Sequence, residues 1–480
     1  ERMRAAIRNS GFDFPPERVL ISLSPADLKK EGAGFDLPIA LAVLGESLLA
    51  KDKNKFCSEQ ILVMGELELS GKIRSVKGVH AAVSTAVSSG IVRCIVPIQN
   101  ADEAREISSA QVYGADTLEN AFRALTDASF FESKSSFSNC LSKDIPNGCE
   151  VVNGVLFPKI SSEYEFAELK GQKKLVRGLQ IAAAGGHNLL AMGAPGCGKT
   201  MSIQKFPGIN PVLTNEEAQS VTRIWSLAGL IKPSEPLIRI PPFRMPHQTA
   251  SLEGICGGGI NCRPGEISLA HNGVLFLDEA AEFKTSVLQS LRVPLELSSV
   301  TLSRAGRTTC YPANFQLLLA VNPCPCGNYG SKSKLCLCSM KSVEQYWKKI
   351  SGPLLDRIDL RIFVENNCEG NNEERENLKT TNQLREGIAT AIKIQRSRQG
   401  IKNAKLSPQE IIDICKLDKD SKEELNNATM RLGFSPRAIS SCIKTSRTIA
   451  DIDGCSDIQL EHIREAISFR KVGCNIISDI

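Results

Sequence analysis

The segment from Gly193 to Thr200 has the residue types needed to bind the phosphates of a nucleotide. It reads Gly193-Ala194-Pro195-Gly196-Cys197-Gly198-Lys199-Thr200 and matches the pattern G-x-x-x-x-G-K-[ST]. Glycines in such a loop let the backbone N–H groups point at the phosphates. Lys199 would reach the β- and γ-phosphates, and the Thr200 hydroxyl would coordinate Mg²⁺. A chance glycine-rich turn is the alternative, but an apolar run typical of a strand comes directly before the segment.

A second motif supplies two carboxylates. The apolar run from Val274 to Leu277 ends at Asp278 and Glu279. Ligands bind at the C-terminal ends of the strands in a parallel sheet. Asp278 would therefore hold Mg²⁺, directly or through water, and Glu279 would polarise the water that attacks the γ-phosphate. The pattern is common by itself, and its position after a phosphate loop makes it specific.

Two further polar residues could complete a hydrolytic site. Asn322 follows another apolar run, residues 315–321, where an amide could position water beside the γ-phosphate. The alternative is a turn asparagine before Pro323. Arg357 lies in Leu354-Leu355-Asp356-Arg357-Ile358-Asp359, where an ordinary surface ion pair is the alternative to a catalytic role.

Four cysteines are clustered between residues 324 and 338. Cys324 and Cys326 form one pair, and Cys336 and Cys338 form a second pair after a short polar loop. Four thiolates at this spacing predict a tetrahedral zinc site, with free or oxidised thiols as the alternative. The other cysteines are mostly single residues in apolar segments, as expected for buried thiols in a reducing cytoplasm.

A basic turn lies between residues 299 and 311. Two strand-like runs flank Arg304-Ala305-Gly306-Arg307, which predicts a hairpin with arginines at its tip. Arg304 and Arg307 could contact a phosphate backbone there. The alternative is a solvent-exposed turn that happens to contain arginine.

The elements that must position these residues alternate between strand and helix over most of the chain. Residues 1–127 predict a compact α/β or α+β domain, with strands expected at 19–23 and 91–96 and a hairpin around Ser70-Gly71. Residues 128–160 are polar and rich in turn residues, as in a linker. Residues 161–370 predict a parallel sheet, and residues 371–480 predict helices alone. The predicted class is therefore α/β.

Composition adds few constraints. The 480 residues carry 58 Lys+Arg against 53 Asp+Glu, so nucleic acid would have to bind a local basic patch. Aromatic residues make up 5%, which argues against a surface built on base stacking. Neither a signal peptide nor an apolar run of membrane-spanning length is evident, so we expect no membrane association. The chain starts at Glu1 within a helical pattern, and we interpret it as an N-terminally truncated fragment.

Three longer strings resemble those of the ComM/YifB family of magnesium-chelatase-like AAA+ proteins. They are Pro242-Phe243-Arg244-Met245-Pro246-His247, Arg263-Pro264-Gly265-Glu266-Ile267-Ser268-Leu269-Ala270-His271-Asn272-Gly273 and Asn322-Pro323-Cys324-Pro325-Cys326-Gly327. The resemblance covers nearly the whole chain. It implies an N-terminal Lon-protease-like (S5-like) α+β domain, an AAA+ core and a C-terminal helical lid.

The resemblance also assigns roles to particular residues. Gly171 and Gln172 match the pair that leads into the adenine pocket, and Asn322 matches sensor 1. Arg357 matches the arginine finger that reaches a neighbouring subunit's ATP, and Arg437 matches the sensor 2 arginine of the lid. Cys197 inside the phosphate loop departs from the commonest form, as do Ala280 and Ala281 after the acidic pair.

By resemblance, the chain is expected to form a hexameric ring that uses ATP and Mg²⁺. It would be a DNA helicase that promotes branch migration of branched or forked DNA in homologous recombination and natural transformation, with the basic hairpin in the pore. A chelatase-type ATPase subunit for metal insertion and a nucleotide-switched scaffold are alternatives. A Lon-like protease is disfavoured, because residues 29–36 hold no Ser or Thr and the helical positions after Gly78 hold no Lys.

Overall fold

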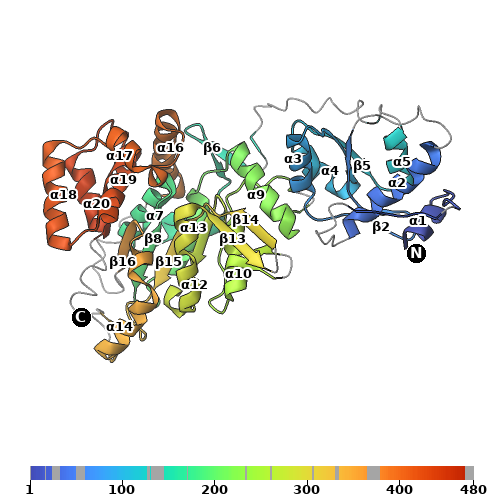
Figure 1. The fold of residues 1–480 in the computed structure, drawn as a ribbon. Helices are drawn as coiled ribbons and strands as arrows, with labels where there is room; N and C mark the ends of the chain where they lie inside the picture. Colours follow the sequence, from blue (N-terminus) through green and yellow to red (C-terminus); the bar gives the residue numbers. More distant parts are fainter. Residues whose placement is uncertain are drawn as a thin grey trace. The chain divides into compact units, whose positions relative to one another are not determined.

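The structure is a computed structural model of the chain. It describes all residues except 1, 17, 24–32, 50–59, 127–129, 131–144, 147, 170, 233–234, 260–261, 305–306, 330–334, 365–378 and 471–480. The chain divides into two units (Figure 1). One unit comprises residues 1–144 and 215–238, and the other comprises residues 145–214 and 239–480.

The first unit is built on a small parallel sheet in the order β1-β4-β5, formed by Ile61–Val63, Arg93–Pro97 and Gln111–Ala115. The predicted hairpin around Ser70-Gly71 is present as β2 (Glu66–Leu67) and β3 (Ile73–Arg74). The strand predicted at 19–23 is wrong, because these residues form no ladder and Leu20 is almost fully exposed. The helices are α1 (Arg2–Asn9), α2 (Asp36–Leu49), α3 (Val79–Ser88), α4 (Ala101–Arg105) and α5 (Leu118–Thr126).

The first unit also takes a helix from far along the sequence. Helix α9 (Asn215–Ala228) packs on α3, and the Gly78 N–H donates to the Ser226 carbonyl at 3.1 Å. The Ser226 hydroxyl donates to the buried carboxylate of Glu103, which also accepts from the His80 N–H. The sequence instead predicts residues 215–238 within the AAA+ core. The amphipathic pattern shows that one face of the helix is buried, but it does not show which apolar surface this face covers.

A five-stranded parallel sheet organises the second unit. Its order is β16-β8-β15-β12-β9, formed by Leu360–Val364, Leu189–Gly193, Gln316–Val321, Val274–Leu277 and Phe243–Arg244. Strands β8, β12 and β15 are buried along their whole length, as expected for a parallel sheet covered on both faces. Alternate residues face two different cores: Leu189 and Ala191 join one apolar cluster, and Leu190 and Met192 join the other.

Helices cover the two faces of this sheet. Helices α7 (Lys173–Gly185), α16 (Thr381–Arg398), α19 (Pro436–Ile452) and α20 (Leu460–Arg470) contribute apolar side chains to one core. The other core includes residues of α11 (Glu266–Leu269), α12 (Thr285–Ser290), α14 (Met340–Lys349) and α15 (Gly352–Leu355). The shorter elements α8 (Lys199–Gln204), α10 (Leu252–Cys256) and α13 (Arg292–Leu297) complete this part of the unit.

The C-terminal helices match the sequence pattern closely. Helices α17 (Pro408–Ile414) and α18 (Lys419–Leu432) join α19 and α20 around a separate apolar core (Figure 1). Ser407 caps α17 in a reciprocal pair of hydrogen bonds with Glu410. Of the residues predicted to be helical, 371–378 and 471–480 lie outside the described residues.

Three antiparallel strand pairs lie within the described residues of the second unit, and the shortest joins β10 (Gly257–Gly258) to β11 (Arg263–Pro264). The predicted basic hairpin is confirmed as β13 (Ser299–Arg304) and β14 (Arg307–Pro312), which pair from Ser299–Pro312 to Arg304–Arg307. The second hairpin, β6 (Cys149–Val152) and β7 (Val155–Pro158), falls within the segment expected to be a linker. Buried Val155 and Phe157 anchor β7 in the core, so this part of the segment belongs to the second unit. Within the described residues, no helix combines the length and apolar character needed to cross a bilayer.

Candidate ATP site and cysteine cluster

The phosphate loop lies between β8 and α8, as the sequence predicts. Gly196 and Gly198 have φ values of 79° and 82°, in the left-handed region that favours glycine. Gly198 directly precedes Lys199, the first residue of α8. Backbone N–H groups at a helix start carry no partner within the helix, so the loop offers donors to an anion.

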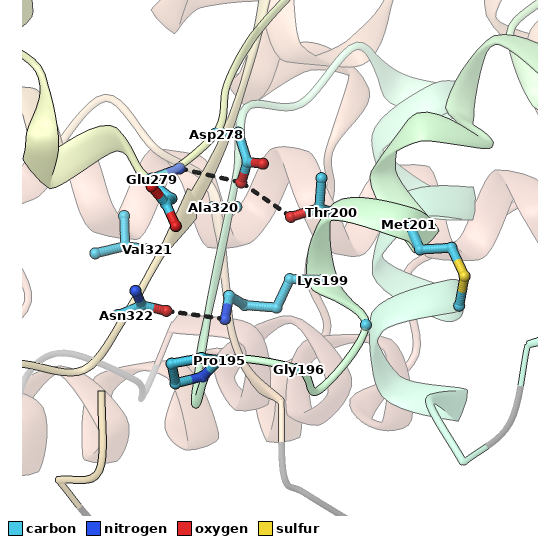
Figure 2. A pocket seen from close by; sticks show the side chains of 11 residues that line it. Pro195, Gly196, Lys199, Thr200, Met201, Asp278, Glu279, Ala320, Val321 and Asn322 are labelled. Atoms are coloured by element: carbon cyan, nitrogen blue, oxygen red, sulfur yellow. Dashed lines mark hydrogen bonds between the residues drawn. The ribbon is translucent and has the colours of Figure 1, made fainter. Parts of the chain in front are cut away.

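The acidic motif meets this loop at the carboxyl edge of the sheet. The Thr200 hydroxyl donates to Asp278 Oδ1 at 3.0 Å, and the Glu279 N–H donates to the same oxygen at 3.0 Å (Figure 2). Glu279 has a φ of 49°, a left-handed conformation that is unusual for a residue with a side chain. The Thr200–Asp278 pair has the oxygen ligands that Mg²⁺ prefers, and Glu279 is exposed beside it.

Lys199 and Asn322 also converge here. The Lys199 ammonium donates to the carbonyls of Gly193 and Ala194, at 2.7 and 2.9 Å, and to Asn322 Oδ1 at 3.2 Å. Burial lowers the pKa of Lys199, although nearby Cys197 and the two carboxylates act in the opposite direction. Asn322 follows β15 immediately, and its carbonyl side faces the lysine (Figure 2).

These residues surround a cavity of about 380 Å³. Its lining consists of Pro195, Gly196, Gly198, Lys199, Thr200, Met201, Asp278, Glu279, Ala320, Val321 and Asn322. An open cavity with a loop of N–H donors, a lysine and two carboxylates fits a nucleoside triphosphate with its Mg²⁺. The fold brings together five side chains that the sequence identifies, those of Lys199, Thr200, Asp278, Glu279 and Asn322.

Gln172 supports the loop from outside the cavity. Its side-chain amide donates to the Cys197 carbonyl, and its Oε1 accepts from the Ser202 hydroxyl at 2.6 Å. Gly171, with a φ of 71°, precedes it at the start of α7. Cys197 is buried, with its Sγ 3.7 Å from Lys199 Nζ. Five of the predicted nucleotide-binding residues do not line the cavity: Gly171, Gln172, Gly193, Ala194 and Cys197.

Arg357 and Arg437 lie together, away from this cavity's lining. The carboxylate of Glu296 on α13 accepts from Arg357 Nη2 at 2.5 Å and also pairs with Arg437. The two guanidinium groups hold the pKa of Glu296 below its ordinary value. Two residues assigned to ATP chemistry therefore share one carboxylate partner, and this partner was not identified from the sequence.

The loop that carries Arg357 is held by the last helix. Arg470 donates from Nη1 to the Ile358 carbonyl at 2.6 Å and from Nη2 to the Asp356 carbonyl at 3.2 Å. These two carbonyls flank Arg357. Arg470 is 1% exposed, so few water molecules can replace these bonds. Arg470 Nη1 also donates to the Ser441 hydroxyl at 3.1 Å, and no sequence motif marks these long-range partners.

Asp359, two residues after Arg357, ties the same loop to the core. It accepts from the Ser441 hydroxyl at 2.5 Å and lies 3.4 Å from His187 Nδ1. Burial alone would raise its pKa, but hydrogen bonding and charge from His187, with Ser441 and Arg470, lower the pKa to about 2. The loop is thus fixed on both sides of Arg357.

The four clustered cysteines converge. Their Sγ atoms all lie within 4.8 Å of one another. Cys324 Sγ is 3.4 Å from Cys326 Sγ and 3.7 Å from Cys336 Sγ, and the Cys326–Cys336 distance is 3.6 Å. Hydrogen bonds from the backbone of Asn328 and from the neighbouring thiols lower the pKa of Cys326 to about 6. Such a donor set fits a thiophilic metal ion.

The remaining candidates lie elsewhere. Arg304 and Arg307 end the paired strands of the basic hairpin, and the two residues between them lie outside the described residues. His247 Nδ1 contacts the Thr249 hydroxyl at 2.8 Å, and His271 Nδ1 accepts from the Asn314 N–H at 3.0 Å.

Fold and site together define a P-loop ATPase of the magnesium-chelatase-like AAA+ class. The family model of magnesium chelatase subunit ChlI matches residues 165–372. A second model, described as subunit ChlI of Mg-chelatase, matches residues 1–100. A third, described as the C-terminal part of magnesium chelatase subunit ChlI, matches residues 378–470.

Comparison with curated relatives identifies the family within this class. The chain is 37% identical to uncharacterized protein YifB of Salmonella typhimurium over 98% of this chain and 88% of the relative. It is 37% identical to competence protein ComM of Haemophilus influenzae over 98% of this chain and 89% of that relative. It is 34% identical to uncharacterized protein Rv2897c of Mycobacterium tuberculosis over 98% of this chain and 90% of that relative. The chain belongs to the ComM/YifB family of magnesium-chelatase-like AAA+ proteins.

Proposed function

We propose that this ATPase is a ring-shaped motor that acts on branched or forked DNA. The observation that carries the proposal is that Arg357 and Arg437 do not line the chain's own ATP cavity and instead pair with Glu296. AAA+ chemistry needs positive charge beside the γ-phosphate in the transition state. A second copy of the chain can supply this charge if its arginines face the first copy's cavity.

Hydrolysis then uses groups from two chains. In the cavity, Glu279 polarises the attacking water and Lys199 neutralises phosphate charge. Thr200 and Asp278 would hold Mg²⁺, which supplies further charge neutralisation when bound. Asn322 positions the water, and Arg357 of the neighbouring chain completes the site. A hexamer is the ring size that we expect from the family.

The basic hairpin would line the pore of this ring. Repetition by rotational symmetry would place Arg304 and Arg307 from every subunit around one axis, where a phosphate backbone could pass. A DNA helicase that promotes branch migration during homologous recombination is the activity that fits this arrangement. Natural transformation is its proposed setting, since one relative carries the name competence protein ComM.

Three assignments accompany this function. We assign a Lon-protease-like fold without peptidase activity to residues 1–127 and a lid role to residues 371–480, and we place the protein in the cytoplasm. Residues 29–36 correspond to the serine-bearing loop of Lon-type peptidases, and residues 29–32 of this stretch lie outside the described residues. The absence of Ser and Thr from residues 29–36 supports the non-peptidase assignment.

A chelatase-type motor is the second candidate, because ChlI models match all three parts of the chain. Such a motor would drive metal insertion through a separate catalytic partner. It predicts ATP hydrolysis that does not respond to DNA.

The deciding experiment measures ATP hydrolysis with and without forked DNA, together with strand displacement. The proposal predicts DNA-stimulated hydrolysis and ATP-dependent unwinding, with both activities lost in Glu279→Gln. Hydrolysis that forked DNA leaves unchanged, without unwinding, would favour the chelatase-type motor. A protein that binds ATP without turnover would instead be a nucleotide-switched scaffold.

A further inference from the structure

The cysteine cluster has the dimensions of a zinc site. Zinc–thiolate bonds of about 2.3 Å in tetrahedral geometry place the sulfur atoms about 3.8 Å apart. The three Sγ–Sγ distances among Cys324, Cys326 and Cys336 range from 3.4 to 3.7 Å. A disulfide would need about 2.0 Å, so the four thiols are not arranged as two covalent pairs. The Tyr329 N–H also donates to Cys324 Sγ at 3.3 Å, as outer-shell donors do at metal sites.

The segment around these cysteines contacts the core through Cys324, Tyr329, Cys336 and Cys338, and the Trp347 indole donates to its Pro323 carbonyl. Its described parts, residues 322–329 and 335–339, contain neither helix nor strand. Leu335 and Leu337 are 82% and 85% exposed, so their side chains do not anchor the second cysteine pair in the core. Cys324 is fully buried, whereas Cys326 is exposed. A metal ion bound by all four thiolates would link the exposed part of the segment to its buried end.

The same segment contacts the ATP site at two points. Cys324 lies two residues after Asn322, whose Oδ1 accepts from Lys199. Gly327 packs against Pro195 of the phosphate loop so closely that a Cβ on Gly327 would lie 2.4 Å from Pro195 Cδ. Gly327 also has a φ of 77°, in the left-handed region that favours glycine. Pro195 and Asn322 both line the cavity, so a shift of the segment would change its shape.

We propose that Cys324, Cys326, Cys336 and Cys338 bind one zinc ion, and that this zinc site braces the phosphate loop and Asn322 for ATP binding. Only the bracing role rests on the proposed ATP site, and the zinc site itself does not depend on it. The zinc ion is structural: all four of its coordination positions are filled by protein thiolates, so none is open to substrate. Nucleotide affinity should therefore depend on a metal that never touches the nucleotide.

The test begins with elemental analysis of the full chain, purified without a histidine tag under reducing conditions. We expect about one zinc per chain in the original protein and in Cys310→Ser, a control at an exposed cysteine outside the cluster. Cys326→Ser and Cys338→Ser should each lose most of the zinc. Zinc-free original protein would overturn the site, as would iron with visible absorbance in place of zinc.

The second measurement is the dissociation constant of a fluorescent ATP analogue. Loss of zinc in Cys326→Ser or Cys338→Ser should weaken binding by about tenfold or more, because small displacements of positioning groups are costly. Gly327→Ala should keep its zinc and still weaken binding, since the new methyl group would push against Pro195. Cooperative thermal unfolding shows whether each variant is folded, and binding values are compared among folded variants.

Each outcome is informative. Zinc-free variants that bind the analogue as tightly as the original protein would overturn the bracing role while leaving the zinc site intact. If the original protein contains zinc but binds no analogue, the proposed ATP site fails and the metal site stands. Removal of zinc by a chelator should weaken binding, and added Zn²⁺ but not Mg²⁺ should restore it.

Discussion

At the scale of single residues, the ATP cavity assigns different tasks to two adjacent carboxylates. Asp278 is engaged by Thr200 and by the Glu279 N–H, whereas the Glu279 side chain is exposed beside the cavity. The left-handed backbone of Glu279 turns the chain just after the strand, and this turn separates the two side chains. These environments support the proposed roles, in which Asp278 holds the metal and Glu279 polarises water.

Replacing Glu279 by Gln should therefore separate binding from turnover. The amide keeps the size of the side chain but cannot accept a proton, so the hydrolysis rate should fall by about 10²–10⁴-fold. Nucleotide affinity should stay within about twofold, because the phosphate loop and Lys199 are unchanged. Steady-state hydrolysis and analogue binding are the measurements.

A matched control is Glu282→Gln, which changes an exposed carboxylate three residues further along. It should hydrolyse ATP at the normal rate. Full activity in Glu279→Gln would remove Glu279 from its assigned role as base.

At the scale of elements, α20 determines the position of the loop that carries Arg357. Replacing Arg470 by Lys keeps a positive charge but cannot bond both flanking carbonyls as a planar guanidinium does. We expect kcat for ATP hydrolysis to fall by about tenfold, with analogue affinity unchanged, because Arg470 lies outside the residues that line the cavity.

The control for this change is Arg464→Lys, at a mostly exposed position on the same helix. It should retain normal kcat, and both variants should unfold cooperatively. Weaker nucleotide binding in Arg470→Lys, with kcat preserved, would contradict a role through Arg357.

The basic hairpin leads to a prediction about salt dependence. If Arg304 and Arg307 contact phosphates, replacing both by Ala should reduce the slope of log affinity against log salt by about 0.7 to 0.9 per lost contact. DNA stimulation and unwinding should be abolished, and basal hydrolysis should continue because the cavity is intact. DNA binding over a salt series is the measurement.

A matched loss of two charges, Lys419→Ala with Lys422→Ala on α18, controls for net charge. This variant should keep both the salt slope and unwinding. Normal unwinding by the hairpin variant would show that the hairpin is not part of the mechanism.

At the scale of the whole molecule, sequence reasoning succeeds where structure is local. The phosphate loop, the Asp278–Glu279 strand, the basic hairpin and helices α18 and α19 follow from patterns within short segments. The placement of α9 in the first unit, the β6–β7 hairpin and the Arg470 clamp depend on partners far along the chain. Apolar periodicity gives the buried face of an element without naming the surface that it covers.

The pairing of Arg357 and Arg437 on Glu296 is another long-range feature, and it leads to a prediction about assembly. Arg357→Ala should lose most of its hydrolysis while keeping its analogue affinity, since the variant's own cavity is complete. The Glu279→Gln variant has the complementary defect, because it retains Arg357 but its own cavity lacks the base. When the two proteins are mixed in equal amounts, an Arg357→Ala cavity beside a Glu279→Gln neighbour regains both groups.

Random mixing should restore about one quarter of the interfaces in each ring, so hydrolysis should rise well above the mean of the two variants. Hydrolysis is measured across mixing ratios, with fluorescence energy transfer between labelled subunits to establish that they exchange. A mixture with the double variant, Arg357→Ala with Glu279→Gln, is the control, because that partner brings no arginine and should restore nothing. If subunits exchange and the first mixture still equals the mean, Arg357 does not act on a neighbouring chain's ATP.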